Sequence, residues 1–175
     1  KRCGVIPIEF VVRGYITGST STSLWTHYNK GERFYCGETF KDGLVKNQKL
    51  DTPVITPTTK SDISDELISG VEIVNRSILT QDEYNYIASK ALELFKFGQE
   101  QADKAGLILV DTKYEFGYDK DGNILLIDEI HTCDSSRYWY KESYADRFAK
   151  GLEPVKLDKD QVRDYVKQRC DPYKD

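Results

Sequence analysis

The chain has 175 residues, of which 39% are hydrophobic and 31% are charged, a composition typical of a globular chain that buries one core. The formal net charge is −4 and no basic stripe stands out, so we expect no nucleic-acid partner. No apolar run reaches membrane-spanning length and no signal peptide is visible, so we expect no membrane partner. Four scattered cysteines without a C-x-x-C pair, and only two histidines, argue against a zinc site and favour a reducing compartment.

The first predicted element is a buried strand over residues 5–12 (VIPIEFVV), with Glu9 as its one internal charge. Arg13 follows, between this strand and the glycines Gly14 and Gly18. Glycines let backbone amides approach a ligand closely, but a strand exit that contains glycine explains them equally well.

Polar connections come next. Residues 19–23 (STSTS) are predicted to form a loop, and residues 43–57 are read as a connection. Residues 56–60 (TPTTK) form a second polar turn. An aromatic patch lies between these segments and is interpreted as packing rather than recognition: Trp25, Tyr28, Phe34 and Tyr35.

A long amphipathic helix is predicted from the capping box that Thr80 and Glu83 form. Its apolar residues recur at helical spacing, and Gly106 marks its C-terminal end. We interpret this helix as scaffold. Further along the chain, residues 158–166 are predicted to form a second amphipathic helix.

A β-hairpin is predicted after the long helix. Residues 107–110 are apolar, and the alternation that follows places Asp111, Lys113 and Glu115 on one face of a strand. Residues 119–123 (DKDGN) are a turn signal, after which a second apolar strand leads directly into Asp128.

The pairing of this hairpin suggests a cation site. A two-residue turn at Asp121-Gly122 sets Glu115 opposite Asp128, and a four-residue turn shifts the pairing by two but keeps both on one face with Lys113. Two carboxylates that meet across strands repel unless a cation lies between them, and oxygen ligands suit Mg²⁺. A solvated hairpin face is the alternative. The apolar strands and the polar loop over residues 131–137 argue against it.

From the residues alone, we therefore predict an α+β domain with a divalent-cation hairpin and several loops suited to anionic groups. This combination indicates ATP–Mg chemistry without naming a reaction.

Motifs in the chain resemble the SAICAR synthetase (phosphoribosylaminoimidazole-succinocarboxamide synthase) family. The segments IPIEFVVRGYITGS, TPTTK followed by DE, GLILVDTKYEFG and ILLIDEIHTCDSSRYW occur in that order, with details closest to the plant-type branch. The resemblance implies an α+β, ATP-grasp-related core with an antiparallel sheet packed with helices. Residues 1–175 would be a single catalytic-core domain from a longer chain, without the family's glycine-rich N-terminal lobe and C-terminal helices.

The resemblance also implies an activity. The family is a carbon–nitrogen ligase of purine biosynthesis that uses ATP and Mg²⁺ to join carboxyaminoimidazole ribonucleotide (CAIR) to L-aspartate, giving SAICAR, ADP and phosphate. Without the flanking regions, the isolated chain is expected to be inactive. The alternatives are another ATP–Mg phosphotransferase on the same scaffold and a non-catalytic nucleotide-binding module. A cytoplasmic location is expected, with a plastid as the alternative, and the oligomeric state stays open.

The resemblance assigns roles motif by motif. Glu115 and Asp128 would hold Mg²⁺, Lys113 would face the ATP phosphates, and Glu9 would lie near the nucleotide. Arg13 and Lys113 are the catalytic candidates. The residues expected to bind substrate are Arg13, Ser19, Lys60, Asp65, Ser135, Arg137 and Arg163.

Two positions depart from the family motifs. Cys133 stands where a proline is expected before Asp134, and Ser64 stands where a histidine usually precedes Asp65. A proline would restrain the loop that presents Ser135.

Overall fold

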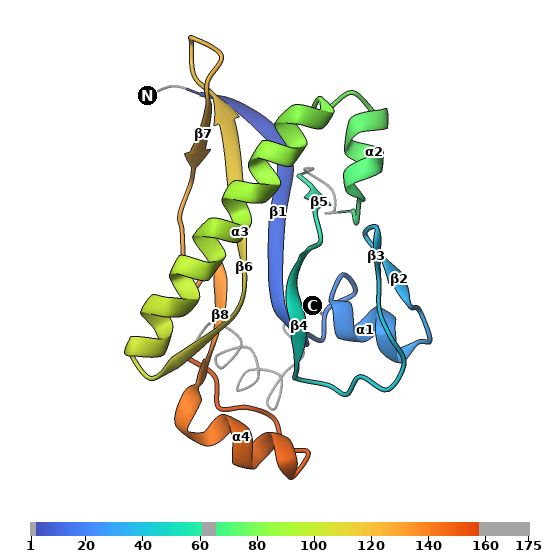
Figure 1. Ribbon diagram of the computed structural model, residues 1–175, viewed down its shortest axis with the longest axis vertical. Coiled ribbons are helices and arrows are strands. Elements are labelled where there is room, and N and C mark those ends of the chain that lie inside the picture. The colour runs from blue at the N-terminus through green and yellow to red at the C-terminus, as the bar shows by residue number, and fades with distance from the viewer. Residues whose placement is uncertain (1–2, 61–65, 158–175) are drawn as a thin grey trace, which may run out of the picture.

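The computed structural model describes residues 3–60 and 66–157 and is built around a six-stranded antiparallel sheet (Figure 1). The main strand order is β4-β1-β6-β7, with β5 paired to β1 and β8 paired to β6. The strands of the sheet are β1 Gly4–Ile16, β4 Gln48–Ile55, β5 Thr58–Thr59, β6 Leu107–Tyr118, β7 Ile124–Ile127 and β8 Ser136–Tyr140. The predicted α+β class with an antiparallel sheet is confirmed. The predicted helix over residues 158–166 lies outside the described residues.

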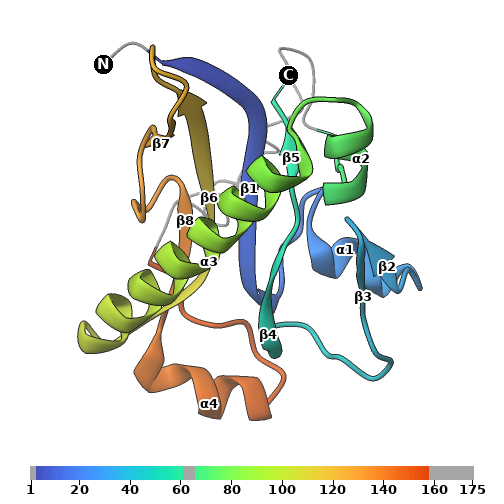
Figure 2. The same cartoon turned by 45° about the horizontal axis from the view of Figure 1, so that its top comes forward.

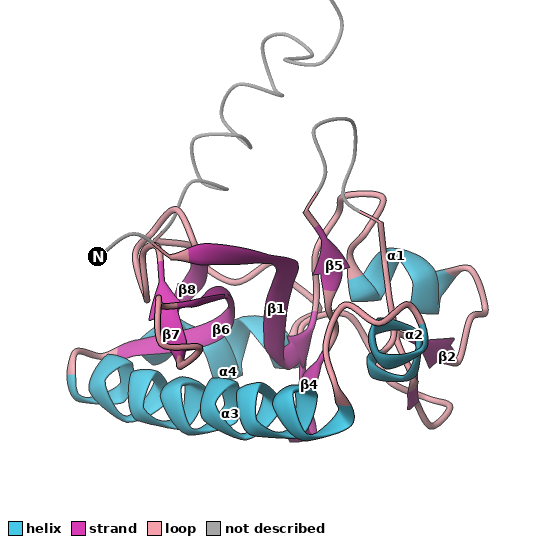
Figure 3. Cartoon of the chain, turned by 90° about the horizontal axis from the view of Figure 1, so that it is seen from above, coloured by secondary structure: helices cyan, strands magenta, loops and turns pink. Residues whose placement is uncertain are grey.

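The helix α3, Gln81–Lys104, runs along one face of this sheet (Figures 2 and 3). The predicted capping box is present, because the Glu83 N–H donates to Thr80 Oγ1 and the Thr80 N–H donates to Glu83 Oε2. The buried side of α3 packs on the even-numbered residues of β1, and Phe10 meets Phe116 of β6 edge to face, with ring centroids 5.7 Å apart. The scaffold role predicted for this helix is confirmed.

The strand β1 is longer than predicted and continues through Arg13 to Ile16. Gly14 lies within this continuation, and a Cβ there would lie 3.3 Å from the Phe95 ring of α3. This glycine therefore allows close helix–sheet packing, and neither a strand exit nor an approach to a ligand accounts for it.

A smaller unit lies beside the sheet and contains α1 Leu24–Asn29, β2 Phe34–Tyr35 and β3 Glu38–Thr39. Leu24, Tyr28 and Tyr35 are buried together in a second apolar cluster, so packing is the role of most of the predicted aromatic patch. Phe34 is the exception, since 65% of its surface is exposed.

The prediction for residues 43–57 was wrong, because this segment contains the strand β4. Its sequence, QKLDTPVI, carries charges and Pro53, which is tolerated only because β4 is an edge strand that pairs with β1 alone. Three helices were also not predicted: α1, α2 Gly70–Asn75 and α4 Lys141–Ala149. The capping box of Ser69 and Glu72 at the start of α2 is a signal that could have revealed it.

The predicted register of the hairpin was wrong by one residue. Tyr118 pairs with Ile124, so Glu115 lies opposite Ile127 and not opposite Asp128. The loop of residues 119–123 sets this register, because Asp119 Oδ1 accepts hydrogen bonds from the backbone N–H groups of Asp121 and Asn123, both at 2.9 Å. Within the described ranges, no helix is both long and apolar enough to cross a membrane.

Candidate active site

The sheet face opposite α3 carries a row of charged side chains from β1 and β6. Strand alternation places Glu9 and Arg13 of β1 on this face, together with Asp111, Lys113 and Glu115 of β6. In the register of the two strands, Glu9 lies opposite Glu115 and Arg13 lies opposite Asp111. The predicted shared face of the three β6 residues is confirmed.

One group on this face is the carboxylate–lysine cluster, formed by Glu9, Lys60, Lys113, Glu115 and Asp128. The facing carboxylates of Glu9 and Glu115 are each held by a lysine: Lys113 Nζ lies 2.7 Å from Glu9 Oε1, and Lys60 Nζ lies 2.5 Å from Glu115 Oε2. Two opposed buried carboxylates repel each other unless cations neutralise them, and the lysines supply those cations.

The pKa values of both lysines report the negative field of this cluster. The hydrogen bond to Glu115 raises the pKa of Lys60. Burial acts to lower the pKa of Lys113, but the hydrogen bond to Glu9 and the nearby carboxylates outweigh it, so the pKa rises. Asp128 contributes to both shifts. The charge of Asp128 therefore acts on both lysines of the cluster, although its predicted strand pairing was wrong.

Backbone geometry explains how Asp128 reaches this position. It follows the last residue of β7 and has a φ of 64°, a left-handed conformation that takes the chain out of the strand. Strand parity therefore does not apply to it. With three carboxylates and two lysines, the cluster carries a formal net charge of −1, which favours a bound cation.

The second group is the arginine–aspartate array of Arg13, Asp111 and Arg137. Arg137 Nη1 donates to both Asp111 oxygens at 3.1 and 2.9 Å, and Arg13 Nη1 lies 3.6 Å from Asp111 Oδ2. The side chains of Arg13 and Asp111 are each only 6% exposed. Two guanidinium groups share one carboxylate, so the array has a formal net charge of +1 and favours a bound anion. Asp111 was not predicted as a site residue.

A polar cavity of about 230 Å³ lies over these groups. Its lining includes Glu9, Arg13, Asp111, Lys113, Asp134, Ser135 and Arg137, together with Thr20, Thr22 and Ser23 from the loop before α1. The structure thus brings together Glu9, Arg13, Lys113, Ser135 and Arg137, as the sequence predicted. It also corrects the predicted polar loop over residues 131–137, whose last two residues belong to β8.

The other predicted residues lie elsewhere or are not described. Ser19 is exposed and lies next to Thr20, but it does not line the cavity. Lys60 contacts Glu115 in the carboxylate–lysine cluster and also does not line the cavity. Asp65 and Arg163 lie outside the described residues.

Tyr35 supports the cavity wall, and sequence reasoning missed it. Its hydroxyl donates to the Thr22 carbonyl oxygen at 2.5 Å, which anchors the loop before α1. Burial, the largest cause, raises the pKa of Tyr35 to about 12, so the hydroxyl stays protonated and can donate. At the start of this loop, Gly18 has a φ of 101°, and an added Cβ would lie 2.3 Å from Ser23 Oγ. No local pattern indicates the Tyr35 contact.

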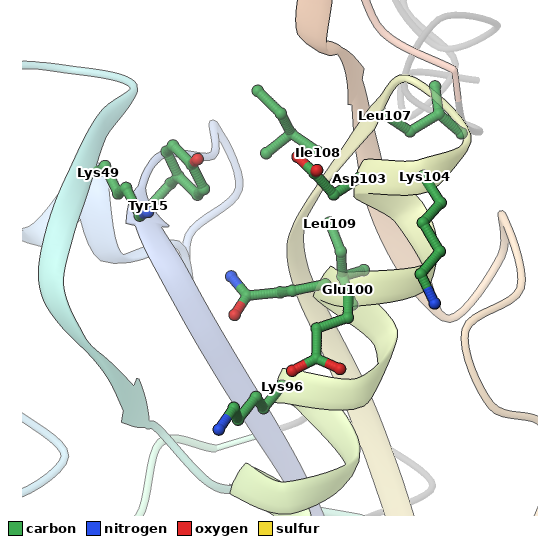
Figure 4. Close-up of a pocket in the computed structure, with 10 residues that line it drawn as sticks. Tyr15, Lys49, Lys96, Glu100, Asp103, Lys104, Leu107, Ile108 and Leu109 are labelled. Atoms are coloured by element: carbon green, nitrogen blue, oxygen red, sulfur yellow. The ribbon is translucent and has the colours of Figure 1, made fainter.

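A larger cavity, of about 600 Å³, lies at the C-terminal end of α3 (Figure 4). Side chains from α3, including Lys96, Glu100 and Lys104, line it together with Tyr15 and Lys49. None of the predicted site residues lines this cavity. The candidate site is therefore located by the charged side chains that converge on the sheet face opposite α3, and not by cavity size.

Comparisons with known proteins identify the family of the chain. The family model described as SAICAR synthetase matches residues 1–175, the whole chain. The chain belongs to the SAICAR synthetase family.

Curated relatives of this SAICAR synthetase chain are about twice its length. It is 62% identical over 175 residues to the chloroplastic phosphoribosylaminoimidazole-succinocarboxamide synthase of Arabidopsis thaliana, covering 100% of the chain and 43% of that protein. The synthase of Legionella pneumophila (strain Paris) is 59% identical, with coverage of 100% of the chain and 56% of the relative.

Solved structures show the same fold. A SAICAR synthase matches with a TM-score of 0.76 and 34% identity, covering 95% of this chain and 51% of that one. The SAICAR synthase of Saccharomyces cerevisiae complexed with SAICAR matches with a TM-score of 0.74 and 32% identity, covering 95% and 51%. A type-2 SAICAR synthetase in complex with ADP matches with a TM-score of 0.70 and 28% identity, covering 93% and 57%.

Cys133, where the family motif has a proline, gives a first testable prediction for this SAICAR synthetase chain. It is exposed in a turn closed by hydrogen bonds between Thr132 and Ser135. Within residues 3–60 and 66–157, its backbone N–H makes no hydrogen bond. Cys133→Pro is therefore expected to raise the free energy of unfolding by about 0.4–1 kcal/mol, by restricting the unfolded chain. Denaturant unfolding measures this, with Cys133→Ala as the control for loss of the thiol. A proline variant less stable than the alanine variant would contradict it.

Proposed function

We propose that this chain forms the catalytic core of a carbon–nitrogen ligase of purine biosynthesis that joins CAIR to L-aspartate at the expense of ATP. The observation that carries the proposal is the side-by-side placement of a cation-favouring cluster and an anion-favouring array on one sheet face of a SAICAR synthetase chain. Relatives solved with SAICAR and with ADP support the choice of ligands. Because the chain spans about half of its relatives, the activity is proposed for the complete protein that contains residues 1–175, with these residues as one domain.

The chemistry that such a site must perform is activation of a carboxylate. A carboxylate oxygen is a poor leaving group, so the γ-phosphoryl group of ATP is transferred to the CAIR carboxylate and ADP departs. The aspartate amine then attacks the carbonyl carbon of this acyl phosphate and phosphate leaves, which completes the amide. The lysine ammonium of Lys113 and the guanidinium of Arg13 are positioned on the same face to offset the negative charge of the phosphoryl group and the carboxylate.

The residues present fit a nucleotide-bound Mg²⁺ better than a protein-only metal site. Within the two described ranges, no group of three or more His, Cys, Asp or Glu side chains is arranged to hold a metal ion. Mg²⁺ commonly uses one or two carboxylates together with phosphates and waters, and Glu115 and Asp128 can supply that number. Bound Mg²⁺ would neutralise phosphate charge during the transfer. We propose that Lys60, which holds Glu115, exchanges that contact for one with an anionic ligand.

The arginine–aspartate array and the adjacent Ser135 are proposed to bind the ribonucleotide phosphate or the carboxylates of aspartate. Guanidinium groups match such oxyanions with paired hydrogen bonds. Glu9 is proposed to lie near the nucleotide. The substrate contacts of Ser19, Lys60, Asp65 and Arg163 remain proposals that rest on the family motifs alone.

Product analysis tests the proposal directly. The complete protein is incubated with Mg·ATP and CAIR, and ADP release is measured with and without L-aspartate. ADP release that requires aspartate, with SAICAR as a product, is expected for the ligase. Release without aspartate indicates a phosphotransferase, and the absence of turnover in a folded protein indicates a nucleotide-binding module. The ATP-grasp relationship, the cytoplasmic or plastid location and the oligomeric state stay predictions or open questions that this assay does not address.

Arg137→Lys tests the substrate side of the site. Lysine keeps the charge but loses the planar guanidinium, whose Nη1 donates to both oxygens of Asp111 and whose other N–H groups can pair with an oxyanion, so the KM of CAIR or aspartate should rise about tenfold while the KM of ATP changes little. Arg33→Lys is the matched control, because Arg33 pairs with the exposed Asp42 and does not line the candidate site. A selective loss of ATP binding in Arg137→Lys would instead indicate that Arg137 binds the nucleotide, and would contradict its assignment to CAIR or aspartate.

A further inference from the structure

The loop of residues 128–135, here called the Asp128 loop, connects β7 to β8 and passes the candidate site at both ends. The negative charge of its first residue, Asp128, acts to raise the pKa values of both lysines of the carboxylate–lysine cluster. Its last residue, Ser135, is tied to β6, because the carbonyl oxygen of Ser135 accepts a hydrogen bond from the Lys113 N–H at 3.1 Å. At its other end, Asp128 directly follows Ile127, which pairs with Glu115 of β6, so the middle of the loop is the part that needs a further anchor.

His131 provides such an anchor, because it contacts a residue on the other face of the sheet. Its side chain is half-buried, whereas Ile130, Thr132, Cys133 and Asp134 around it are exposed. Nε2 of His131 lies 2.6 Å from the hydroxyl oxygen of Tyr114, whose side chain is fully buried in the core under α3. The carbonyl oxygen of His131 also accepts a hydrogen bond from the Tyr138 hydroxyl at 2.7 Å.

The long helix makes room for this imidazole. A Cβ on Gly98 of α3 would lie 2.6 Å from His131 Cε1 and 2.7 Å from Nε2. Glycine in the middle of a helix is unfavourable, so this position is explained by the imidazole and by Leu109, whose Cδ2 would lie 2.8 Å from the same Cβ, because both occupy the space of the missing side chain. His131 itself has a φ of 56°, a backbone conformation that non-glycine residues keep only where their surroundings fix it.

The imidazole is held in its neutral form. Burial lowers the pKa of His131, and burial raises the pKa of Tyr114, so a neutral ring and a protonated hydroxyl share the hydrogen bond. Neither group lines the cavity over the arginine–aspartate array. Their contact is therefore available for positioning and not for contact with a substrate in that cavity.

We propose that His131 is a positioning residue that anchors the Asp128 loop to the core through Tyr114, and thereby fixes where the Asp128 carboxylate meets a nucleotide-bound cation. The inference rests on the proposed function, because it assumes that Asp128 takes part in binding Mg·nucleotide. It assigns a role to the second histidine of the chain and to Gly98, neither of which touches the candidate site.

Tyr114→Phe tests the anchor with the loss of one oxygen atom. In the complete protein, the Kd of Mg·ADP measured by calorimetry is expected to rise about tenfold, as is common when a group that orients a metal ligand is removed. The KM of CAIR should change less than about twofold, because Ser135 and Arg137 are held separately by β6. Tyr118→Phe is the matched control on the same strand. It also removes one hydroxyl contact, to Glu83, and should leave both values unchanged.

Two further variants separate positioning from a general loss of stability. Gly98→Ala keeps both polar partners but places a methyl group against His131 and Leu109, so its melting temperature is measured beside Mg·ADP binding, which should weaken as in Tyr114→Phe. The double variant Tyr114→Phe/His131→Phe leaves no unpaired polar group and should bind Mg·ADP no more weakly than either single variant. If Tyr114→Phe binds Mg·ADP as tightly as Tyr118→Phe, the inference is overturned and the proposed function stands. If the unaltered protein does not bind Mg·ADP at all, the proposed function fails first.

Discussion

Glu115→Gln is expected to lower kcat by about 100-fold and to raise the Mg²⁺ concentration needed for half-maximal activity at least about tenfold. The amide has nearly the shape of the carboxylate but no charge, so it cannot offer a metal ion the same ligand. Asp128→Asn should shift the Mg²⁺ dependence in the same direction. The measurement is steady-state turnover of the complete protein over a Mg²⁺ titration at saturating substrates.

Protein stability gives an independent readout for the same variant. Glu115 is a buried carboxylate that lies opposite Glu9 and pairs with Lys60, so removing its charge removes a repulsion together with an ion pair. Because these two effects offset each other, the melting temperature of Glu115→Gln should change little. Glu93→Gln is the control, because Glu93 pairs with Lys90 on the exposed side of α3. An unchanged Mg²⁺ dependence in both Glu115→Gln and Asp128→Asn would rule out the proposed metal ligands.

Asp111→Ala is expected to lower the free energy of unfolding by about 3–5 kcal/mol. The change leaves the guanidinium of Arg13 buried without its carboxylate, and a buried charge that loses its partner is far more costly than an exposed one. Asp111→Asn keeps one acceptor oxygen for Arg137 and should cost less. Both variants should also raise the KM of CAIR or aspartate, because the two arginines lose the group that orients them.

Denaturant unfolding of the complete protein measures this effect, and Asp42→Ala provides the matched control. Asp42 also pairs with an arginine, but its side chain is 91% exposed, so its removal should change stability little. If Asp111→Ala lowers the free energy of unfolding no more than Asp42→Ala does, the prediction that the buried arginine–aspartate array stabilises the fold is wrong.

Features encoded in neighbouring residues could be predicted from the sequence. The capping box at Thr80 and Glu83 correctly located the start of α3, because the two residues satisfy each other's backbone N–H groups within one turn. The alternation along β6 correctly placed Asp111, Lys113 and Glu115 on one face, since successive side chains of a strand point to opposite sides. The family motifs also identified five of the side chains that line the cavity: Glu9, Arg13, Lys113, Ser135 and Arg137.

Only the tertiary structure decided which partners these side chains meet. The hairpin register depended on how Asp119 organises its loop, and a one-residue error made Asp128 the expected partner of Glu115, whereas the actual partner is Ile127. The edge strand β4 forms because β1 offers it a hydrogen-bonding edge, although its own sequence favours a connection.

The charges of the site show the same division between local and long-range information. Residue types and strand alternation determined which charged side chains face one side of the sheet. Their pairing was decided by contacts across the chain, with Lys113 meeting Glu9 at a separation of 104 residues and Lys60 meeting Glu115 at 55. The physical reason is that a buried charge is stable only beside an opposite charge or a hydrogen-bond donor, and which segment supplies it is set by the packing of the whole sheet.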